Sequence, residues 1–318
     1  MTRRTVLASS AAAAAGGVAP AQAQPAPREK GPLVWMNMDQ KELDDAYDQS
    51  VYAPNQPQLG KRRAANSELV RKRLGEPRRF SYGSTPIESM EVWTTTKPNA
   101  PVMVFVHGGA WRVGLAKDNC YAAELYVNAG AHYAVLDFIN VDQAGGDLMP
   151  MAEQIRRAIA WIGKNAASFG GDPNRIHVSG HSSGAHLAGA TLITDWAAFG
   201  ARPDIIKGAV LCSGMYDLKP ARLSKRGAYV KFTDAMEDAL STQRHLARIT
   251  CPVVVAYGTY ETPEFQRQSR DFAAALKAAG KPVTLLVGEG YNHFEMPETF
   301  ASPYGLLGRA VLEQLKLA

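Results

Sequence analysis

Residues 180–184 read Gly-His-Ser-Ser-Gly, and this stretch decides the fold. It follows a short strand-like run at residues 175–179 and precedes a small-residue, helix-like run at residues 185–190. Glycines two residues before and after a serine are typical of a strained strand-to-helix turn, in which larger side chains would clash. The pattern predicts a nucleophile elbow that presents the hydroxyl of Ser182 and the backbone N–H of Ser183.

A second motif lies upstream of the elbow. Residues 101–106, Pro-Val-Met-Val-Phe-Val, predict a buried parallel strand that leads into residues 107–111, His-Gly-Gly-Ala-Trp. This loop resembles the oxyanion-hole loop of lipases and esterases. Attack on a carbonyl places negative charge on its oxygen, and each fixed N–H donor there contributes about 3–4 kcal/mol. We expect the donors to be the N–H groups of Gly109, Ala110 and Ser183.

Two details of this loop stay open. The N–H of Gly108 could replace one of the three donors, and the glycine pair would also suit an ordinary tight turn. We expect His107 to brace the loop by hydrogen bonding and to transfer no proton.

A serine nucleophile needs a base, and the base is held by an acid. In this architecture the three groups follow the order Ser, acid, His, each just after the carboxyl end of a strand. Of the seven histidines, His245 and His293 lie well beyond the elbow. His293 follows the last expected strand, whereas His245 lies in a polar stretch before the penultimate strand. The order therefore predicts His293 as the general base.

The acid is expected after the penultimate strand, where Glu261 would orient the imidazole of His293. Two alternatives remain from the sequence. Glu264 lies one helical turn further on, and Asp217 ends the preceding strand, although a helix-capping role explains Asp217 equally.

Three segments, residues 107–111, 180–187 and 261–269, resemble the arylformamidase (kynurenine formamidase) branch of the α/β-hydrolases, close to the hormone-sensitive-lipase-like esterases. The third segment is the most diagnostic, because a Ser-Pro-Glu-Phe-like run ending in Gln-Ser is typical of that branch. The resemblance extends from about residue 38 to the C-terminus. It implies a serine hydrolase of small esters or N-formyl aromatic amines that needs no metal and no cofactor, and homodimers are common among similar proteins.

The chain departs from this branch at two positions. The branch usually carries Asp where this chain has Glu261, and a bulky aromatic residue where it has Ala110. The smaller alanine would leave more room beside the acyl group. We therefore expect a carboxylesterase or arylformamidase-like enzyme that cleaves a small ester or amide through an acyl-enzyme on Ser182. The alternatives are a perhydrolase with the same triad and a binding protein without catalysis.

The pattern of apolar runs predicts a single α/β-hydrolase domain over residues 38–318. An antiparallel pair at residues 80–82 and 90–93 is followed by strands alternating with helices, which builds a mostly parallel sheet of about eight strands with helices on both faces. The expected strands of the alternating part are residues 101–106, 133–138, 175–179, 207–212, 252–257 and 282–287.

Two segments are expected to shape the pocket. Residues 38–75 look helical, and in the resembling family such a segment packs over the active-site mouth. Residues 218–247 contain no expected strand and are interpreted as a small helical lid that includes Tyr229 and Phe232. The expected apolar anchors of the first segment are Tyr47, Tyr52 and Leu59. The expected pocket walls are Trp111, Phe138 and Tyr291, although Trp111 could equally belong to the core.

Residues 1–23 are interpreted as a twin-arginine signal peptide. Arg3 and Arg4 precede a mildly apolar, alanine-rich run that is too short to span a bilayer stably, and Ala21-Gln22-Ala23 has the spacing that signal peptidase needs. We expect cleavage after Ala23 and a periplasmic or secreted protein, with an uncleaved anchor as the alternative. Residues 24–37 are expected to form a disordered lead-in.

Charge and cysteine content exclude some functions. Loss of the leader lowers the formal net charge from +5 to +3, which is too small to suggest nucleic-acid binding. No membrane association is expected after cleavage. The basic stretches at residues 61–63 and 71–73 are interpreted as a solvated helix face. The three cysteines lack metal-ligand spacing, and Cys212 and Cys251 are expected to be buried thiols.

Overall fold

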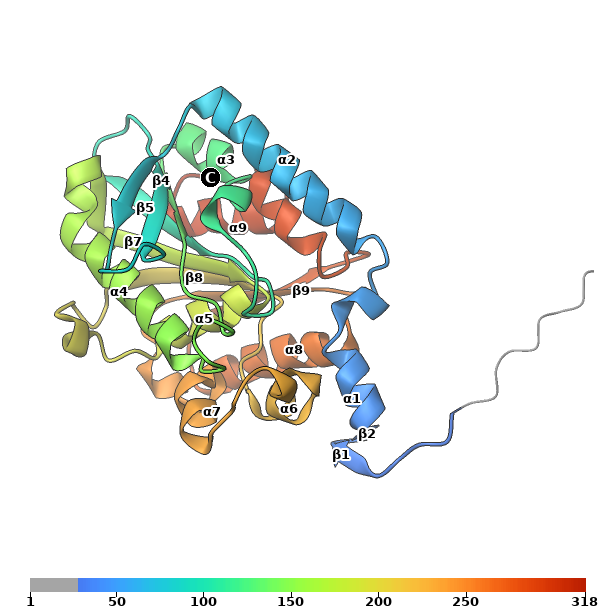
Figure 1. The fold of residues 1–318 in the computed structure, drawn as a ribbon. Coiled ribbons are helices and arrows are strands. Elements are labelled where there is room, and N and C mark those ends of the chain that lie inside the picture. Colours follow the sequence, from blue (N-terminus) through green and yellow to red (C-terminus); the bar gives the residue numbers. More distant parts are fainter. Residues whose placement is uncertain (1–27) are drawn as a thin grey trace, which may run out of the picture. The chain divides into compact units, whose positions relative to one another are not determined.

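An eight-stranded sheet forms the centre of the chain, and its strand order is β10-β9-β8-β7-β5-β6-β4-β3 (Figure 1). The computed structural model describes residues 28–318, of which residues 32–318 form one unit. The strands β6, β5, β7, β8, β9 and β10 are parallel to their neighbours. Strand β4 is antiparallel to both of its neighbours, β6 and β3. This arrangement confirms the predicted, mostly parallel sheet. The strands are β3 (Arg78–Ser81), β4 (Ser89–Trp93), β5 (Ala100–Val106), β6 (His132–Leu136), β7 (Gly171–His181), β8 (Ile206–Cys212), β9 (Val253–Gly258) and β10 (Val283–Gly288).

Helices cover both faces of this sheet because the central strands are apolar on both sides. Along β5, Val104 and Val106 pack on one face, and Met103 and Phe105 pack on the other, as the two-residue period of a strand requires. The first face is covered by α4 (Met149–Asn165), α5 (Ser183–Leu192) and α8 (Pro263–Ala278), and the second by α2 (Gln56–Leu74), α3 (Ala123–Ala129) and α9 (Leu306–Leu315).

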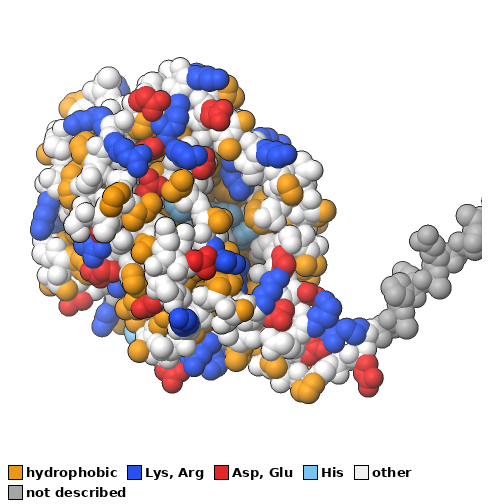
Figure 2. Space-filling view, viewed as in Figure 1, with side chains coloured by type: hydrophobic (Ala, Val, Ile, Leu, Met, Phe, Trp, Pro, Cys, Tyr) orange, Lys and Arg blue, Asp and Glu red, His pale blue; other side chains and the backbone are white. Residues whose placement is uncertain are grey.

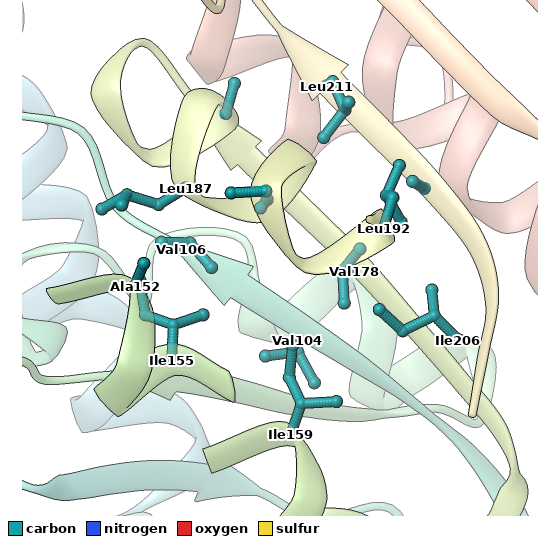
Figure 3. Close-up of a cluster of buried hydrophobic side chains, with 14 of the residues drawn as sticks. Val104, Val106, Ala152, Ile155, Ile159, Val178, Leu187, Leu192, Ile206 and Leu211 are labelled. Carbon is teal, nitrogen blue, oxygen red and sulfur yellow. The ribbon is translucent and has the colours of Figure 1, made fainter. Parts of the chain in front are cut away.

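The first face holds the larger core cluster, part of which Figure 3 shows. Ile155 and Ile159 of α4 lie against Val104 of β5, and Leu187 of α5 lies near Val106. All five side chains are at most 1% exposed. This packing fixes the strand ends from which the loops described below emerge.

The N-terminal part of the described chain differs from the prediction in two ways. β1 (Leu33–Trp35) pairs with β2 (Met38–Asp39). The expectation of disorder for residues 24–37 is therefore wrong for residues 33–37. The expected helix at residues 38–75 is interrupted, because Asp48 caps a short 3-10 turn and Asn55 begins a new helix with a proline in its first turn. The elements are α1 (Gln40–Ala46), η1 (Gln49–Val51) and α2.

Of the three expected anchors in this segment, Tyr47 and Leu59 are buried, whereas Tyr52 is 44% exposed. The prediction for Tyr52 is therefore wrong, since this tyrosine lies in the turn between η1 and α2. The expected leader at residues 1–23 lies outside the described residues.

The lid expected between β8 and β9 is helical, with no strand among residues 218–247. It contacts α1, because Arg226 donates a hydrogen bond from Nη2 to the carbonyl oxygen of Tyr47 (3.3 Å). None of the helices within residues 28–318 combines the length and apolarity that crossing a bilayer requires. The lid consists of α6 (Lys219–Leu223), η5 (Lys225–Ala228), α7 (Asp234–Leu240) and η6 (Thr242–Arg244).

Candidate active site

Ser182 lies at the junction of β7 and α5 in a backbone conformation that few non-glycine residues adopt, with φ +58° and ψ −126°. The flanking glycines make this turn possible. A Cβ atom on Gly180 would lie 2.5 Å from the carbonyl oxygen of Gly184, and one on Gly184 would lie 2.1 Å from that of Val106. The backbone N–H of Ser182 donates to the carbonyl oxygen of Cys212 (2.9 Å). The turn predicted from the sequence is therefore present, with Ser182 at its tip.

His293 and Glu261 form a buried pair on the neighbouring loops. His293 Nδ1 lies 2.8 Å from Glu261 Oε2, and neither residue is more than 2% exposed. The other carboxylate oxygen, Oε1, accepts hydrogen bonds from Ser213 Oγ (2.6 Å) and from the backbone N–H of Gly258 (2.7 Å). These two donors fix the carboxylate so that Oε2 remains directed at the imidazole.

The alternative acids have other partners. Glu264 bonds the guanidinium of Arg267 through both carboxylate oxygens, at 2.8 and 2.6 Å. Asp217 Oδ1 bonds Arg244 (2.8 Å) and accepts a hydrogen bond from the backbone N–H of Lys219 (3.2 Å), although the N-cap position of α6 is Leu218. His245 lies in the lid, where its Nε2 bonds the carbonyl oxygen of Asp238 (2.9 Å). Of the three carboxylates considered, Glu261 is the one that the fold brings to His293.

Burial shifts both members of the pair toward their uncharged forms. It raises the pKa of Glu261 to about 7, against the opposing effect of the hydrogen bonds from Ser213 and Gly258. Burial first, and then the positive charges of Arg226 and Arg63, hold the pKa of His293 well below its usual value. A neutral imidazole is the form that can accept a proton, so this environment suits a general base.

Ser182 and His293 line the same cavity, which has a volume of about 480 Å³. Figure 2 shows a hollow on this face of the molecule, with histidine atoms inside it. Residues of α2, the oxyanion-type loop and the lid complete the walls, including Ala64, Gly109 and Tyr229. A cavity of this size can enclose a small organic substrate. The N-terminal segment and the lid thus both contribute residues to the walls of this cavity.

The loop after β5 is folded so that the N–H groups of Gly109 and Ala110 stay free. Gly109, Ala110 and Trp111 all have positive φ, at 123°, 55° and 64°. The loop is tied to the elbow because the N–H of Trp111 donates to Ser183 Oγ (3.1 Å). Within residues 28–318, the N–H groups of Gly109, Ala110 and Ser183 have no hydrogen-bond acceptor. Gly109 and Ala110 line the cavity, so their N–H groups are available to a negatively charged oxygen.

Three expected pocket walls are placed elsewhere. Trp111 is 2% exposed and lies outside the cavity lining, because its indole N–H donates to His186 Nδ1 (3.1 Å) in the core. Phe138 is buried and stacks on the ring of His107 at 4.4 Å. Tyr291 is 40% exposed and also does not line the cavity. Neither Trp111 nor Tyr291 therefore forms part of the wall of this cavity, and Trp111 has the core position that the sequence left open.

Sequence reasoning missed three residues of the site, namely Ser213, Arg63 and Arg226. The interpretation of the basic stretches as solvated is wrong for Arg63, which lines the cavity and bonds the carbonyl oxygen of Phe294 (2.7 Å). It is also wrong for Arg71, which pairs with the buried Glu91. A signal for Arg63 exists in the spacing, because residues 59, 63, 67 and 70 share one face of α2 and the other three are buried.

Two further expectations concern metals and thiols. In the part of the chain that the structure describes, no group of three or more His, Cys, Asp or Glu side chains could hold a metal ion. All three cysteines are buried free thiols, so the expectation for Cys212 and Cys251 is confirmed. Cys212 lies close to the site, with its Sγ 3.2 Å from Ser213 Oγ.

Comparison with known proteins adds independent information. A sequence-family profile described as BD-FAE matches residues 91–201. The chain is 28% identical over 297 residues to a kynurenine formamidase of Danio rerio, covering 88% of this chain and 98% of that protein. It is 32% identical over 226 residues to a kynurenine formamidase of Salmo salar, covering 68% of this chain and 74% of the relative.

Solved structures agree with this picture of the fold. A candidate thioesterase of Silicibacter sp. tm1040 superposes with a TM-score of 0.71 at 26% identity, covering 84% of this chain and 97% of that one. The match therefore includes most of each chain.

Proposed function

Since this chain belongs to the kynurenine formamidase family and is an α/β-hydrolase that cleaves small esters or amides, we propose that Ser182 is its nucleophile, His293 its general base and Glu261 the acid that holds the base. One observation carries this assignment. The 2.8 Å contact between Glu261 Oε2 and His293 Nδ1 leaves the other imidazole nitrogen for the cavity, which Ser182 also lines.

Acylation follows from this arrangement. Ser182 Oγ attacks the carbonyl carbon while its proton passes to His293 Nε2, and the negative charge that forms on the carbonyl oxygen is stabilised by the N–H groups of Gly109, Ala110 and Ser183. The imidazolium then gives that proton to the leaving oxygen or nitrogen. The bond to the leaving group breaks, and the acyl group remains on Ser182 as an ester.

Deacylation repeats the same steps with water. His293 takes a proton from a water molecule, the resulting hydroxide attacks the acyl carbon, and the proton returns to Ser182 Oγ as the carboxylic acid leaves. Throughout the cycle Glu261 stabilises the positive charge on His293 and is not itself consumed. The products are the acid and an alcohol or amine.

The acyl-enzyme can be tested by rapid mixing with a chromogenic short-chain aryl ester. We expect a burst of aryl alcohol close to one equivalent per active site, provided that deacylation is slower than acylation, and an acyl mass added to the peptide that contains Ser182. The Ser182→Ala variant should show neither. An adduct on a different residue would overturn the assignment.

For the substrate, we propose aryl esters and N-formyl aromatic amines with short acyl groups. The family supports the amide, and the small side chain of Ala110 in the cavity wall supports an acyl group larger than formyl. Measuring kcat/KM for a formanilide and for the matched phenyl formate, acetate and butyrate would establish both preferences. Rates that fall steeply from formate to acetate would contradict the larger acyl pocket.

We also propose that residues 1–23 direct export by the twin-arginine route, which would place the mature protein in the periplasm or outside the cell. The paired Arg3 and Arg4 and the small residues up to Ala23 support this proposal. Replacing both arginines by lysine should leave the precursor unprocessed. An N-terminus at Gln24 in the mature protein would identify the cleavage site.

The oligomeric state is part of the same proposal, because the resemblance favours a homodimer. Light scattering on the purified mature protein measures the mass directly. A mass equal to that of one chain at micromolar concentration would contradict the dimer.

A further inference from the structure

A buried histidine that takes no part in the acyl transfer lies between the elbow and the lid. His186 is one turn into α5, and its backbone N–H donates to the carbonyl oxygen of Ser182 (3.1 Å). Its side chain is completely buried. Both ring nitrogens nevertheless have hydrogen-bond partners, and these partners belong to two different parts of the molecule.

The two partners determine where this imidazole carries its proton. Nδ1 lies 3.1 Å from the indole Nε1 of Trp111, which acts only as a donor. Nε2 lies 3.1 Å from the carbonyl oxygen of Leu240, which acts only as an acceptor. The ring of His186 is therefore neutral, with its proton on Nε2. Burial favours the same state, because it lowers the pKa of His186 to about 4.

The lid supplies the acceptor for Nε2, since Leu240 is the last residue of α7. This end of the lid is itself fixed by hydrogen bonds. Ser241 Oγ donates to the carbonyl oxygen of Glu237 (2.5 Å) and accepts from the backbone N–H of Leu218 (3.0 Å). The bond to Leu240 thus holds the imidazole of His186 in the orientation and protonation state in which Nδ1 accepts from the indole.

Trp111 ends a loop segment whose backbone is in an unfavourable conformation. Gly109, Ala110 and Trp111 follow one another with positive φ, and two of them carry side chains. Such conformations persist only where surrounding contacts enforce them. The backbone N–H of Trp111 donates to Ser183 Oγ, and the hydrogen-bonding group of its indole is used entirely for His186. The bond to His186 therefore anchors the residue that directly follows the N–H donors of the loop.

We propose that His186 is a positioning residue, which holds the indole of Trp111 and thereby keeps the preceding N–H donors of the loop directed at the oxyanion. This inference rests on the proposed function, because it assumes that an oxyanion forms beside Ser182. His186 does not line the cavity and acts only through Trp111. A small displacement of the donors is enough to slow the reaction, because stabilisation of the developing charge depends on a fixed geometry.

The variant His186→Phe keeps a buried ring and removes both hydrogen bonds. For a neutral phenyl ester we expect kcat per folded molecule to fall by about 10- to 100-fold, which is less than the loss expected when a donor itself is removed. KM should change by less than about twofold, because the donors act on the transition state. A change in KM with kcat unchanged would overturn the proposal, since the residue would then act on substrate binding.

The variant His132→Phe is the matched control. His132 is also completely buried, and its Nδ1 accepts a hydrogen bond from the backbone N–H of Thr95 (3.3 Å). It begins β6, at the end of the sheet opposite to the turns that carry the site. We expect His132→Phe to lose stability and to keep the native kcat per folded molecule. An equal loss of kcat in His132→Phe and His186→Phe would overturn the proposal, because the effect would then come from the fold in general.

A double-mutant cycle measures whether the two side chains act through one bond. Trp111→Phe removes the indole donor and keeps an aromatic ring, so it should slow the reaction as His186→Phe does. Because both changes break the same hydrogen bond, the double variant should be at most about twofold slower than the slower single variant. Losses that multiply would contradict the proposal. If His186→Phe does not fold, the loss of kcat in Trp111→Phe provides the test.

A boronic acid reports on the N–H donors without turnover. The boron atom of phenylboronic acid accepts an electron pair from Ser182 Oγ, whose proton passes to His293. The tetrahedral anion that forms resembles the intermediate of the reaction and needs the same donors. We expect the inhibition constant to be about 10- to 100-fold higher in His186→Phe than in the native enzyme.

The native enzyme distinguishes failure of this inference from failure of the proposed function. If the native protein is neither acylated on Ser182 nor inhibited by phenylboronic acid, the proposed function is wrong and the inference is wrong with it. If the native protein is acylated and inhibited, but His186→Phe has the same kcat and the same inhibition constant, the proposed function stands and the positioning role of His186 is wrong.

Discussion

The central strands and the turns that follow their carboxyl ends have opposite properties. In the middle of β5 and β7, Val104 and Val178 are completely buried among aliphatic side chains in extended conformation (Figure 3). At the carboxyl ends of the same strands, the chain turns through Ala110 and Ser182 with positive φ, beside buried ionisable groups. Apolar burial stabilises the first region, whereas the second holds conformations and charges that cost free energy.

The distribution of backbone strain supports this contrast. Seven non-glycine residues between positions 28 and 318 have positive φ, and four of them lie in the loops that follow β5, β7 and β8. Each such conformation costs about 1–3 kcal/mol and persists only where the surroundings enforce it. The core strands therefore supply the rigidity that keeps the serine, the imidazole and the N–H donors in place. The four residues in these loops are Ala110, Trp111, Ser182 and Ser213.

The largest effect should come from Ser182→Ala. We expect kcat/KM to fall by about 10⁵-fold or more, because the nucleophile is lost. The free energy of unfolding should change by less than about 0.5 kcal/mol, since Ser182 Oγ makes no hydrogen bond within the described chain and alanine keeps the same Cβ. Steady-state kinetics and urea unfolding measure the two quantities. Substantial remaining activity would mean that another residue is the nucleophile.

Glu261→Gln should lower kcat/KM by about 10³- to 10⁴-fold while the protein remains folded. The amide cannot balance the charge of the imidazolium, and its NH₂ group would oppose the N–H of His293 Nδ1. Glu264→Gln is the matched comparison, because Glu264 is equally buried but bonds Arg267. A larger loss of rate in Glu264→Gln, at equal folded fraction, would favour the alternative acid.

In the core between α4 and the sheet, Ile155→Ala should lower stability and leave activity nearly unchanged. Ile155 is fully buried in the cluster between α4 and the sheet, so truncation should lower the free energy of unfolding by about 2–5 kcal/mol. The value of kcat/KM, measured at a temperature where the variant is folded, should stay within about twofold of the native enzyme. A large loss of activity in the folded variant would show that the two regions are not separable in this way.

A smaller effect concerns stability at different pH values. Because the pKa of Glu261 rises from about 4.5 in the unfolded chain to about 7 in the folded protein, the folded state holds an extra proton between these values, and stability falls as pH rises through this window. The Glu261→Gln variant cannot titrate at this position, so it lacks this fall of stability with rising pH. Its stability relative to the native protein should therefore increase by up to about 3 kcal/mol from pH 4.5 to pH 7.5. A constant difference across that range would contradict the raised pKa.

The smallest effect is expected from Arg63→Gln with a neutral ester. Since Arg63 helps to lower the pKa of His293, its removal should move the acidic limb of the kcat/KM profile to higher pH. Arg62→Gln is a suitable control, because Arg62 is exposed and pairs with Glu298 away from the cavity. A shift of equal size in both variants would point to a general charge effect.

The same contrast explains what the sequence could predict. The core strands appear as apolar runs, because burial on both faces leaves little choice of residue, and all eight strands of the main sheet were located within a few positions. The chain order of serine, acid and histidine led to Ser182, Glu261 and His293. In the structure Glu261 contacts His293, and His293 and Ser182 line one cavity.

Side-chain direction could not be predicted in the same way. Trp111 looked like a pocket wall, but the positive φ at this position and the preceding one places the indole in the core, where it meets His186. Arg63 looked like an ordinary surface cation, and nothing in the sequence singled out Arg226, because their position at the cavity depends on how α2 and the lid pack over the strand ends. Long-range packing of this kind leaves only a weak trace in local sequence.

Labelling with a fluorophosphonate tests the central claim most directly. The account predicts a single phosphonylated residue, Ser182, with labelling that is lost in Ser182→Ala and is strongly slowed in His293→Ala, because the imidazole activates the hydroxyl. Mass spectrometry of the intact protein and of its peptides measures both. Labelling of a different residue, or labelling of Ser182 at an undiminished rate without the imidazole, would contradict the account.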